Sequence, residues 1–314
     1  MQPDWMEMTP KKQMTLSGEY SFEGKGLHTG KVSRMILKPA PAGTGIVFRR
    51  TDIGPGAVVE AVAENISSTE RSTTISKGEA SVSTIEHVMS ALTGMGVDNA
   101  IVDIDNVEVP ILDGSARFYA EALSRDGLTE QDAARRYITL EKEIEVKDEA
   151  TGAWVKVTPA PAPSFDITVD FGSRILGVQS ARWDMGVDYA EQLAPCRTFV
   201  FFHEIAMLFR HNLVKGGDVD NAIVIVEHPV SEADLSELSR LFNLPTLEVR
   251  EGYLNNLTLH FPDECGRHKL LDLIGDMRLA GGYMNAAVTA FKPGHTINSR
   301  LTKAVRCHIS NKGF

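Results

Sequence analysis

Two segments of the chain carry apolar residues at the spacing of an amphipathic α-helix. In the first, residues 85–92, the apolar positions are Ile85, Val88, Met89 and Leu92. Ser83 or Thr84 can cap its start and Gly94 can end it. In the second, residues 266–278, the apolar positions are Leu270, Leu271, Ile274 and Met277. The short apolar runs 45–48, 165–169 and 286–291 are typical of strands, so the chain is predicted to mix helices with sheet.

The sequence repeats itself in two places. Residues 38–42, KPAPA, are echoed by residues 158–162, TPAPA, at an offset of 120. Residues 97–102, VDNAIV, recur as residues 219–224 at an offset of 122. The second echo is longer and follows a Gly-containing break in both copies, so it carries more weight. Two similar offsets in the same order predict duplication of a unit of domain size.

A polar stretch, residues 126–135, lies between the two repeats and is the natural boundary between them. We therefore predict one domain at residues 1–130 and a second at residues 136–314. Each half follows the order strands, helix, strand, helix. This order is typical of an α+β fold with two duplicated domains of similar topology.

Charge and cysteine content exclude several classes of protein. The 314-residue chain has a formal net charge of −10, which does not suit bulk binding to nucleic acid or anionic lipid. Its 3 cysteines show no CxxC spacing, which favours a reducing compartment and excludes a thiolate zinc finger. The sequence contains no signal peptide and no membrane-spanning run. We expect a cytoplasmic monomer with at most peripheral membrane contact.

Candidate metal ligands occur on both predicted helices. His268, Asp272 and Asp276 are spaced by four residues, so they project from one face of the second helix. An imidazole and a carboxylate at this spacing can share a metal ion. Glu86 and His87 lie in the first turn of the other helix and offer a potential base beside a nitrogen ligand. Together they predict a His₂Asp set with open coordination positions, which is typical of catalytic rather than structural zinc.

Taken singly, each of these motifs has a simpler interpretation. A His–Asp pair four residues apart is more often a solvated helix face, and Glu86-His87 alone is more often an exposed first turn. His295 follows the strand 286–291 in a Pro-Gly turn, where an isolated histidine is more often just exposed. The strand can nevertheless return His295 beside Asp276. That carboxylate would raise the pKa of the imidazole and suit it to act as a general acid.

The chain resembles the UDP-3-O-acyl-N-acetylglucosamine deacetylases, zinc enzymes of lipid A synthesis, over nearly its whole length. Several motifs in the right order carry the resemblance, which makes it specific. They are GLHTG at 26–30, STIEH at 83–87, PILDGSA at 110–116, RTF at 197–199, GG at 216–217 before NAIV at 221–224, RHKLLD at 267–272 with GD at 275–276, and GH at 294–295.

The resemblance implies two domains of similar topology, each a sheet backed by two helices, with the active site at their interface. It implies that His87, His268 and Asp272 bind one catalytic Zn²⁺, with Fe²⁺ as the alternative metal in vivo. The substrate would be an acylated UDP-sugar, and the products acetate and UDP-3-O-acyl-glucosamine. Some relatives carry a fused dehydratase domain, which we do not expect here because the sequence ends at Phe314.

The resemblance also implies catalytic roles. Glu86 would be the general base and His295 the general acid, with Asp276 behind it. Lys269 and Thr198 would stabilise the oxyanion that forms when water attacks the amide. Either His295 or Glu86 can then protonate the leaving amine.

Substrate-binding residues are implied in the same way. Lys292 resembles the family's lysine near the substrate diphosphate, and the insert that begins at Phe199 would line a passage for the fatty-acyl chain. We expect Ile205 and Met207 to form part of one wall of that passage. One departure is Gly266, where we expect a bulkier apolar residue, so the start of the second metal-binding helix is predicted to be loose.

Two other functions fit the same ligand set. Two histidines and one carboxylate also form the facial triad of Fe(II) oxygenases, although the usual HxD spacing is absent. A non-catalytic nucleotide-sugar- or lipid-binding module with a structural metal is the second alternative. Oxygen dependence would identify the first, and an absence of deacetylation would identify the second.

Overall fold

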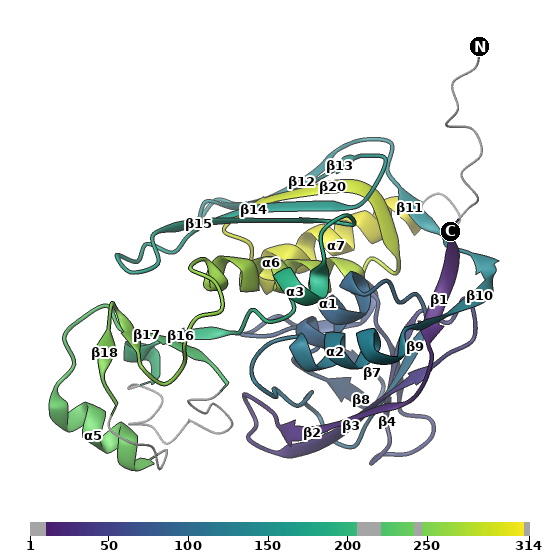
Figure 1. Cartoon of the computed structure of the whole chain (residues 1–314). Coiled ribbons are helices and arrows are strands. Elements are labelled where there is room, and N and C mark those ends of the chain that lie inside the picture. The colour runs from purple at the N-terminus through teal and green to yellow at the C-terminus, as the bar shows by residue number, and fades with distance from the viewer. Residues whose placement is uncertain (1–10, 206–220, 242–246, 311–314) are drawn as a thin grey trace.

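The computed structural model describes residues 11–205, 221–241 and 247–310. Two β-sheets form the outer layers of the main body, and two layers of helices lie between them (Figure 1). A smaller sheet with its own helix projects from one side. One hydrophobic core runs through both halves of the main body, and two small clusters serve the projecting sheet.

The sheet of the first half has five strands with alternating buried and exposed side chains, as expected for a sheet with one covered face. In spatial order they are β2 (Tyr20–Lys25), β3 (Val32–Pro39), β9 (Ala100–Ile104), β4 (Ile46–Arg50) and β5 (Val58–Glu60). β9 is antiparallel to β3 and parallel to β4, and every other pairing is antiparallel. In β3, Met35 and Leu37 point into the core.

The sheet of the second half repeats this arrangement. Its order is β12 (Ile144–Asp148), β13 (Ala153–Pro159), β20 (Tyr283–Phe291), β14 (Ser164–Asp170) and β15 (Val178–Asp184). β20 is antiparallel to β13 and parallel to β14, as β9 is to β3 and β4. A short strand, β11 (Tyr137–Thr139), also pairs with β20. The predicted α+β fold with two units of similar topology is confirmed, whereas the proposed domain limits remain a prediction.

Two helices back each sheet. They are α1 (Glu86–Gly94) and α2 (Arg117–Asp126) in the first half, and α6 (Glu264–Arg278) and α7 (His295–Ser310) in the second. α1 packs against α6 in the middle of the molecule (Figure 1). The contact is close because Gly275 has no side chain: a Cβ at this position would overlap the carbonyl oxygen of Glu86. The backbones of the two helices that carry the candidate ligands therefore touch.

Only the weaker of the two sequence echoes reflects the duplication. Pro39 ends β3 opposite Ala100, and Pro159 ends β13 opposite Ala286, so KPAPA and TPAPA occupy equivalent places. The longer echo is misleading, because the residues that repeat β9 form β17 (Ile223–Ile225) in the projecting sheet. The true counterpart of β9 is β20. A fainter match in the sequence, GVDNAIV at 96–102 with GYMNAAV at 282–288, reflects this equivalence.

The predicted boundary stretch contains a strand. Most of it forms β10 (Leu128–Ala134), which pairs with β1 (Lys12–Leu16) in a separate two-stranded sheet. Its polar character fits this place, because alternate side chains of a two-stranded sheet at the surface face solvent. A three-stranded sheet follows the 3₁₀ turn at Ala63–Asn65 and consists of β6 (Ile66–Ser68), β7 (Thr74–Lys77) and β8 (Ala80–Val82).

The projecting sheet is inserted before α6. Its order is β16 (Phe199–Phe201), β17, β19 (Tyr253–Leu254) and β18 (Val249–Arg250), with α5 (Glu232–Leu241) packed on its outer face. The short helix α3 (Tyr189–Gln192) precedes it. Side chains alternate between the two faces: Ile223 and Ile225 point toward the main body, and Val224 points toward α5.

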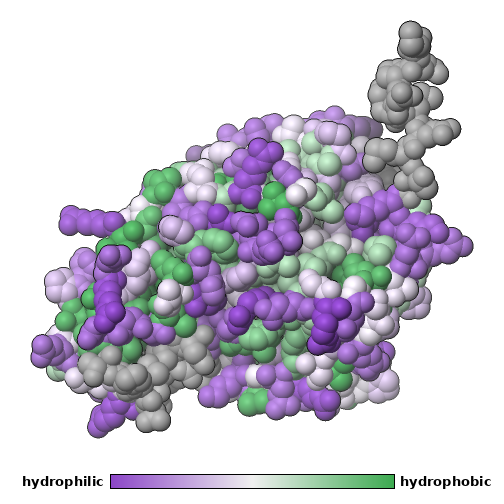
Figure 2. All heavy atoms as spheres, in the orientation of Figure 1, coloured by the Kyte–Doolittle hydropathy of each residue, from purple (hydrophilic) through white to green (hydrophobic). Residues whose placement is uncertain are grey.

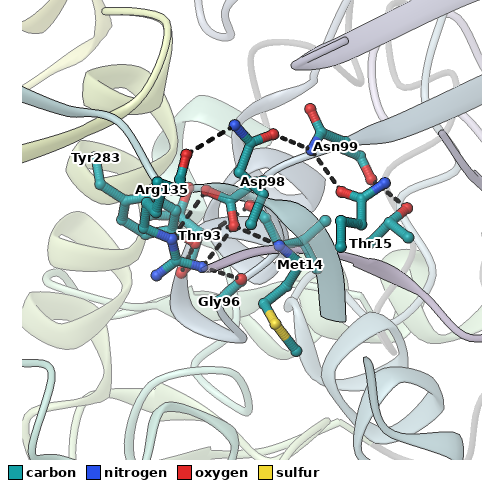
Figure 3. A network of polar contacts seen from close by, with 12 residues as sticks. Met14, Thr15, Thr93, Gly96, Asp98, Asn99, Arg135 and Tyr283 are labelled. Atoms are coloured by element: carbon teal, nitrogen blue, oxygen red, sulfur yellow. Dashed lines mark hydrogen bonds and ion pairs between the residues drawn. The ribbon is translucent and has the colours of Figure 1, made fainter. Parts of the chain in front are cut away.

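A buried polar network joins the two halves at the far end of α1 (Figure 3). Arg135, from the connection between the halves, donates to Asp98 through Nε at 2.9 Å and Nη2 at 2.6 Å. The guanidinium also lies 4.1 Å from the ring centroid of Tyr283, at the start of β20. The Tyr283 hydroxyl donates to the carbonyl oxygen of Thr93 in α1. These contacts fix the start of β20 against the C-terminal end of α1.

Candidate metal centre and active site

α1 starts without the predicted side-chain cap. Its N-cap is Ile85, and neither Ser83 nor Thr84 accepts a bond from the helix. The hydroxyl of Thr84 instead donates to Glu108 Oε1 at 2.9 Å, and Thr84 has a φ of 58°. The sharp bend at Thr84 turns the chain from β8 into the helix. It leaves Glu86 and His87, both buried, in the first helical turn.

Glu108 explains the GLHTG motif, to which sequence reasoning gave no role. Its buried carboxylate accepts bonds from the backbone N–H groups of His28 and Thr29, and from the Thr29 hydroxyl at 2.6 Å. It also holds Thr84. A Cβ on Gly26 would overlap this carboxylate, so the motif needs glycine there. Glu108 thus joins the GLHTG loop to the start of α1.

Three candidate ligands converge as predicted. Atoms of His87, from α1, and of His268 and Asp272, from α6, lie within 4.8 Å of one another and are buried. Asp272 Oδ1 lies 3.6 Å from His87 Nε2 and 3.4 Å from His268 Nε2. These distances exceed hydrogen-bond length and fit atoms that face a common centre. Oδ1 is buried and has no hydrogen-bond partner, whereas Oδ2 accepts a bond from Lys269 Nζ at 2.9 Å.

The protonation states suit a divalent cation. Burial lowers the pKa of His87 to about 3 and also lowers that of His268, so both imidazoles are neutral near pH 7. His268 Nδ1 lies 3.0 Å from the carbonyl oxygen of Cys196. Because a carbonyl only accepts, Nδ1 carries the proton and Nε2 keeps a lone pair for a metal. Burial opposes ionisation of Asp272, but nearby positive charge, above all the Lys269 ammonium, outweighs it and lowers the pKa of that carboxyl.

Glu86 is placed to act as a base beside this group. Its Oε2 accepts a bond from the backbone N–H of Thr73 at 3.0 Å. Burial raises the pKa of Glu86 to about 7, and His295 partly offsets that rise. A carboxyl with a pKa close to working pH is well matched to taking up and releasing a proton.

His295 begins α7 and lies beside Asp276, as predicted from the strand that precedes it. Its Nδ1 is 3.0 Å from Asp276 Oδ2, and its Nε2 is 3.9 Å from Glu86 Oε1. Burial alone would lower the pKa of His295, but Asp276 and Glu86 raise it to about 9. The Asp276 carboxylate is further held by the Thr73 hydroxyl at 2.6 Å and by Asn298 Nδ2 at 2.9 Å.

Phe199 and Lys269, from the predicted substrate and oxyanion sites, border this centre. The ring of Phe199 lies 6.3 Å from that of His268, and Lys269 Nζ is 5.4 Å from the Phe199 ring centroid. Thr198 is half-buried just before β16, and its backbone N–H donates to the carbonyl oxygen of Gly114. The structure thus brings the DGSA and RTF motifs together.

The remaining predicted substrate residues are not part of the metal group. Lys292 Nζ lies 3.4 Å from Asp170 Oδ2 at the end of β14. Ile205 lines a cavity of about 550 Å³ between the projecting sheet and α5, to which Phe202, Val226 and Leu238 also contribute. None of the candidate metal ligands lines this cavity. Met207 falls outside the described residues, so the predicted passage remains a prediction.

The expected looseness at Gly266 is absent. α6 begins at Glu264, before the glycine, and Gln179 Oε1 accepts a bond from the Gly266 N–H at 2.7 Å. The Gln179 side chain occupies the space that a side chain at position 266 would need. The departure from the family pattern is therefore compensated by a neighbouring strand.

Sequence reasoning missed several residues of the site. Thr73 contacts Glu86, Asp276 and His295, yet it lies in an unremarkable Ser/Thr-rich stretch. Asn298 was also missed, although the sequence carries a signal for it: it lies one helical turn after His295. The Cys196 carbonyl gives no sequence signal, since every residue has a carbonyl group.

Comparison with known proteins identifies the family. Residues 13–239 and 245–306 match the family described as LpxC, UDP-3-O-acyl N-acetylglycosamine deacetylase. The chain belongs to this family. The matched ranges include every candidate ligand and catalytic residue of the site.

Individual LpxC proteins are similar over most of the chain. The bifunctional enzyme LpxC/FabZ of Porphyromonas gingivalis is 41% identical over 300 residues, which are 95% of this chain and 65% of that protein. The chain therefore spans slightly less than two thirds of this relative. The UDP-3-O-acyl-N-acetylglucosamine deacetylase of Geobacter sp. is 39% identical over 92% of this chain and 87% of its own length. That of Thioalkalivibrio sulfidiphilus is 35% identical over 94% and 90%.

Proposed function

We propose that the protein is a zinc-dependent hydrolase that removes the N-acetyl group from UDP-3-O-acyl-N-acetylglucosamine. The products are acetate and UDP-3-O-acyl-glucosamine, and the reaction is an early committed step of lipid A biosynthesis. The observation that carries the proposal is the buried group His87, His268 and Asp272 with Glu86 beside it, in a chain of the LpxC family. Relatives named as this deacetylase support the substrate.

The three ligand residues fit a zinc ion, with Fe²⁺ as the alternative. Two neutral imidazoles and one carboxylate leave coordination positions open, as in catalytic zinc sites. The unpartnered Asp272 Oδ1 supports this set, because a buried carboxylate oxygen otherwise has a partner. When bound there, the metal lowers the pKa of water and polarises a carbonyl group.

Glu86 and Lys269 supply the first half of the reaction. Glu86 takes a proton from the attacking water while the new C–O bond forms at the acetyl carbon. The carbonyl oxygen gains the negative charge, which the Lys269 ammonium and the Thr198 hydroxyl stabilise. One such donor typically contributes about 2.7–4 kcal/mol. Lys269 also holds Asp272 Oδ2, so the same ammonium orients a ligand residue.

His295 completes the reaction by protonating the leaving amine. The Asp276 carboxylate at Nδ1 keeps the imidazolium charged and turns Nε2 toward Glu86. When the C–N bond breaks, the proton on Nε2 moves to the sugar nitrogen and acetate leaves. Glu86, which holds the proton it took from water, is the alternative donor.

Substrate binding follows from the surroundings of the site. Phe199 covers His268 and begins the projecting sheet, where Ile205 and Met207 would form part of the wall of an apolar passage for the acyl chain. Apolar patches alternate with polar side chains on the surface of the projecting part (Figure 2). Each buried methylene contributes about 0.8 kcal/mol, so a long chain would supply much of the binding energy. Lys292 would contact the diphosphate.

No helix in the described residues is long and apolar enough to cross a membrane.

Acetate release from the acylated UDP-sugar tests the function. We expect turnover by the purified protein, loss of turnover after treatment with a chelator, and recovery when zinc is added back. Dependence of the reaction on oxygen would indicate the oxygenase alternative. Metal binding without acetate release would indicate a binding module and contradict the proposal.

The pH dependence of kcat/KM should be bell-shaped. Activity needs Glu86 ionised and His295 protonated, so it rises as Glu86 loses its proton and falls as His295 loses its own. A bound cation favours the ionised form of Glu86, which places the acid limb below about 7. The same cation disfavours the imidazolium, so the alkaline limb lies at or below about 9. The limbs belong to the coupled pair; a wild-type profile without an alkaline limb would contradict the role of His295.

A further inference from the structure

His268, the candidate ligand on α6, is part of a closed ring of contacts between that helix and the segment before β16. Glu264 and His268 lie four residues apart, so they project from the same face of the helix. Both contact the segment that leads into β16: Glu264 binds Arg197, and His268 binds the carbonyl oxygen of the preceding residue, Cys196. Two consecutive residues of one segment are therefore fixed to two consecutive turns of one helix.

Both carboxylate oxygens of Glu264 accept hydrogen bonds, and Arg197 donates through its backbone N–H, Nε and Nη2. Glu264 Oε1 accepts from the Arg197 backbone N–H at 3.0 Å and from its Nε at 2.8 Å. Oε2 accepts from Arg197 Nη2 at 3.1 Å and from the backbone N–H of His260 at 2.6 Å. Arg197 Nη2 also donates to the carbonyl oxygen of Thr258 at 2.6 Å. The side chains are 6% and 0% exposed.

These bonds fix backbone as well as side chains. Because Glu264 holds the Arg197 N–H, it fixes the peptide plane that contains the Cys196 carbonyl, which accepts from His268 Nδ1. The next residue, Thr198, immediately precedes β16, which begins at Phe199. A shift of Arg197 would thus move the partner of His268 and the residue predicted to bind the oxyanion.

We propose that the Arg197–Glu264 pair positions the metal centre: it holds the Cys196 carbonyl that sets the tautomer and ring direction of His268. The inference rests on the proposed metal site. Stability alone does not explain the pair, because a buried ion pair is often no more stable than apolar residues of similar volume. A positioning role explains it, since partners behind a ligand histidine typically change metal affinity about 10–100-fold.

Zinc affinity of the intact chain, measured by competition with a chromogenic chelator, tests this inference. Glu264→Gln keeps the volume but places an amide N–H₂ against donors, so we expect affinity to fall about 10–100-fold. Asp98→Asn is the matched control, because it also leaves a buried arginine, Arg135, without its carboxylate. Its zinc affinity should stay within about twofold of wild type, given that Asp98 binds none of the candidate ligand residues.

A second readout does not need metal. In the metal-free protein, the ¹⁵N chemical shifts of His268 should report the Nδ1–H tautomer. Glu264→Gln should shift them toward a tautomer mixture, and Asp98→Asn should not. If Glu264→Gln proves unable to fold, Arg197→Lys provides the same test, because one ammonium cannot satisfy both Glu264 oxygens and Thr258.

The outcomes separate this inference from the proposed function. Unchanged zinc affinity and an unchanged tautomer in the folded variant would overturn the positioning role while leaving the metal site intact. An equal loss of affinity in Asp98→Asn would also overturn it, because the effect would then follow stability. If the wild-type chain fails to bind zinc, the proposed function itself is wrong, and the inference falls with it.

Discussion

Replacing Glu86 with glutamine should lower kcat by about 10²–10⁴-fold, the range that general acid–base catalysis contributes, while zinc content stays at the wild-type level. The amide keeps the size of the side chain, and its oxygen can still accept from the Thr73 N–H. It cannot take a proton from water. The measurement pairs steady-state acetate release with the zinc content of the same sample.

The control for this variant is Glu79→Gln, which makes the same chemical change at an exposed residue between β7 and β8. It should leave both rate and zinc content unchanged. A Glu86→Gln enzyme with near-wild-type turnover would show that another group is the base. A variant that loses zinc would show instead that Glu86 helps to hold the metal.

The helices and the placement of their candidate ligands could be predicted because their signals are local. The spacing of His268, Asp272 and Asp276 along one helix fixes their common face whatever the rest of the chain does. His295 beside Asp276 followed from the length of one strand. The α+β class followed from the order of apolar patterns, and the structure confirms it.

The failures come from contacts between residues far apart in sequence. Thr84 caps nothing because Glu108, 24 residues later, takes its hydroxyl. Gly266 is tolerated because Gln179 comes from another strand. The VDNAIV echo misled because a short apolar strand has the same composition in any sheet, whereas pairing partners decide which strand is equivalent. Such partners are set by tertiary packing and leave little trace in a single sequence.

Asp272 also shows why placement and role must be tested separately. Its neighbours place one oxygen on Lys269 and leave the other facing two histidines. Asp276, one turn later and equally buried, has the Thr73 hydroxyl on one oxygen, with Asn298 and His295 at the other. Two similar carboxylates on one helix face are therefore expected to have different roles: Asp272 would bind the metal, and Asp276 would hold the general acid His295.

Asp272→Ala should lower zinc affinity by at least as much as a change at a residue behind a ligand, which typically costs about 10–100-fold. Activity should fall together with metal content. The variant removes the one anionic candidate ligand and leaves two neutral imidazoles, which bind a divalent cation more weakly. Because zinc that binds only the folded state stabilises it by mass action, added zinc should raise the Tm of wild type much more than that of the variant.

Asp276→Ala is the matched comparison for this measurement, since it removes a carboxylate of equal burial from the same face of α6. It should keep zinc affinity near that of wild type but lose turnover, because His295 loses the group that holds its proton. If Asp272→Ala binds zinc normally and turns over substrate, His87 and His268 have a different third partner. If the two variants lose zinc equally, the ligand set extends to Asp276 and the division of roles along α6 is wrong.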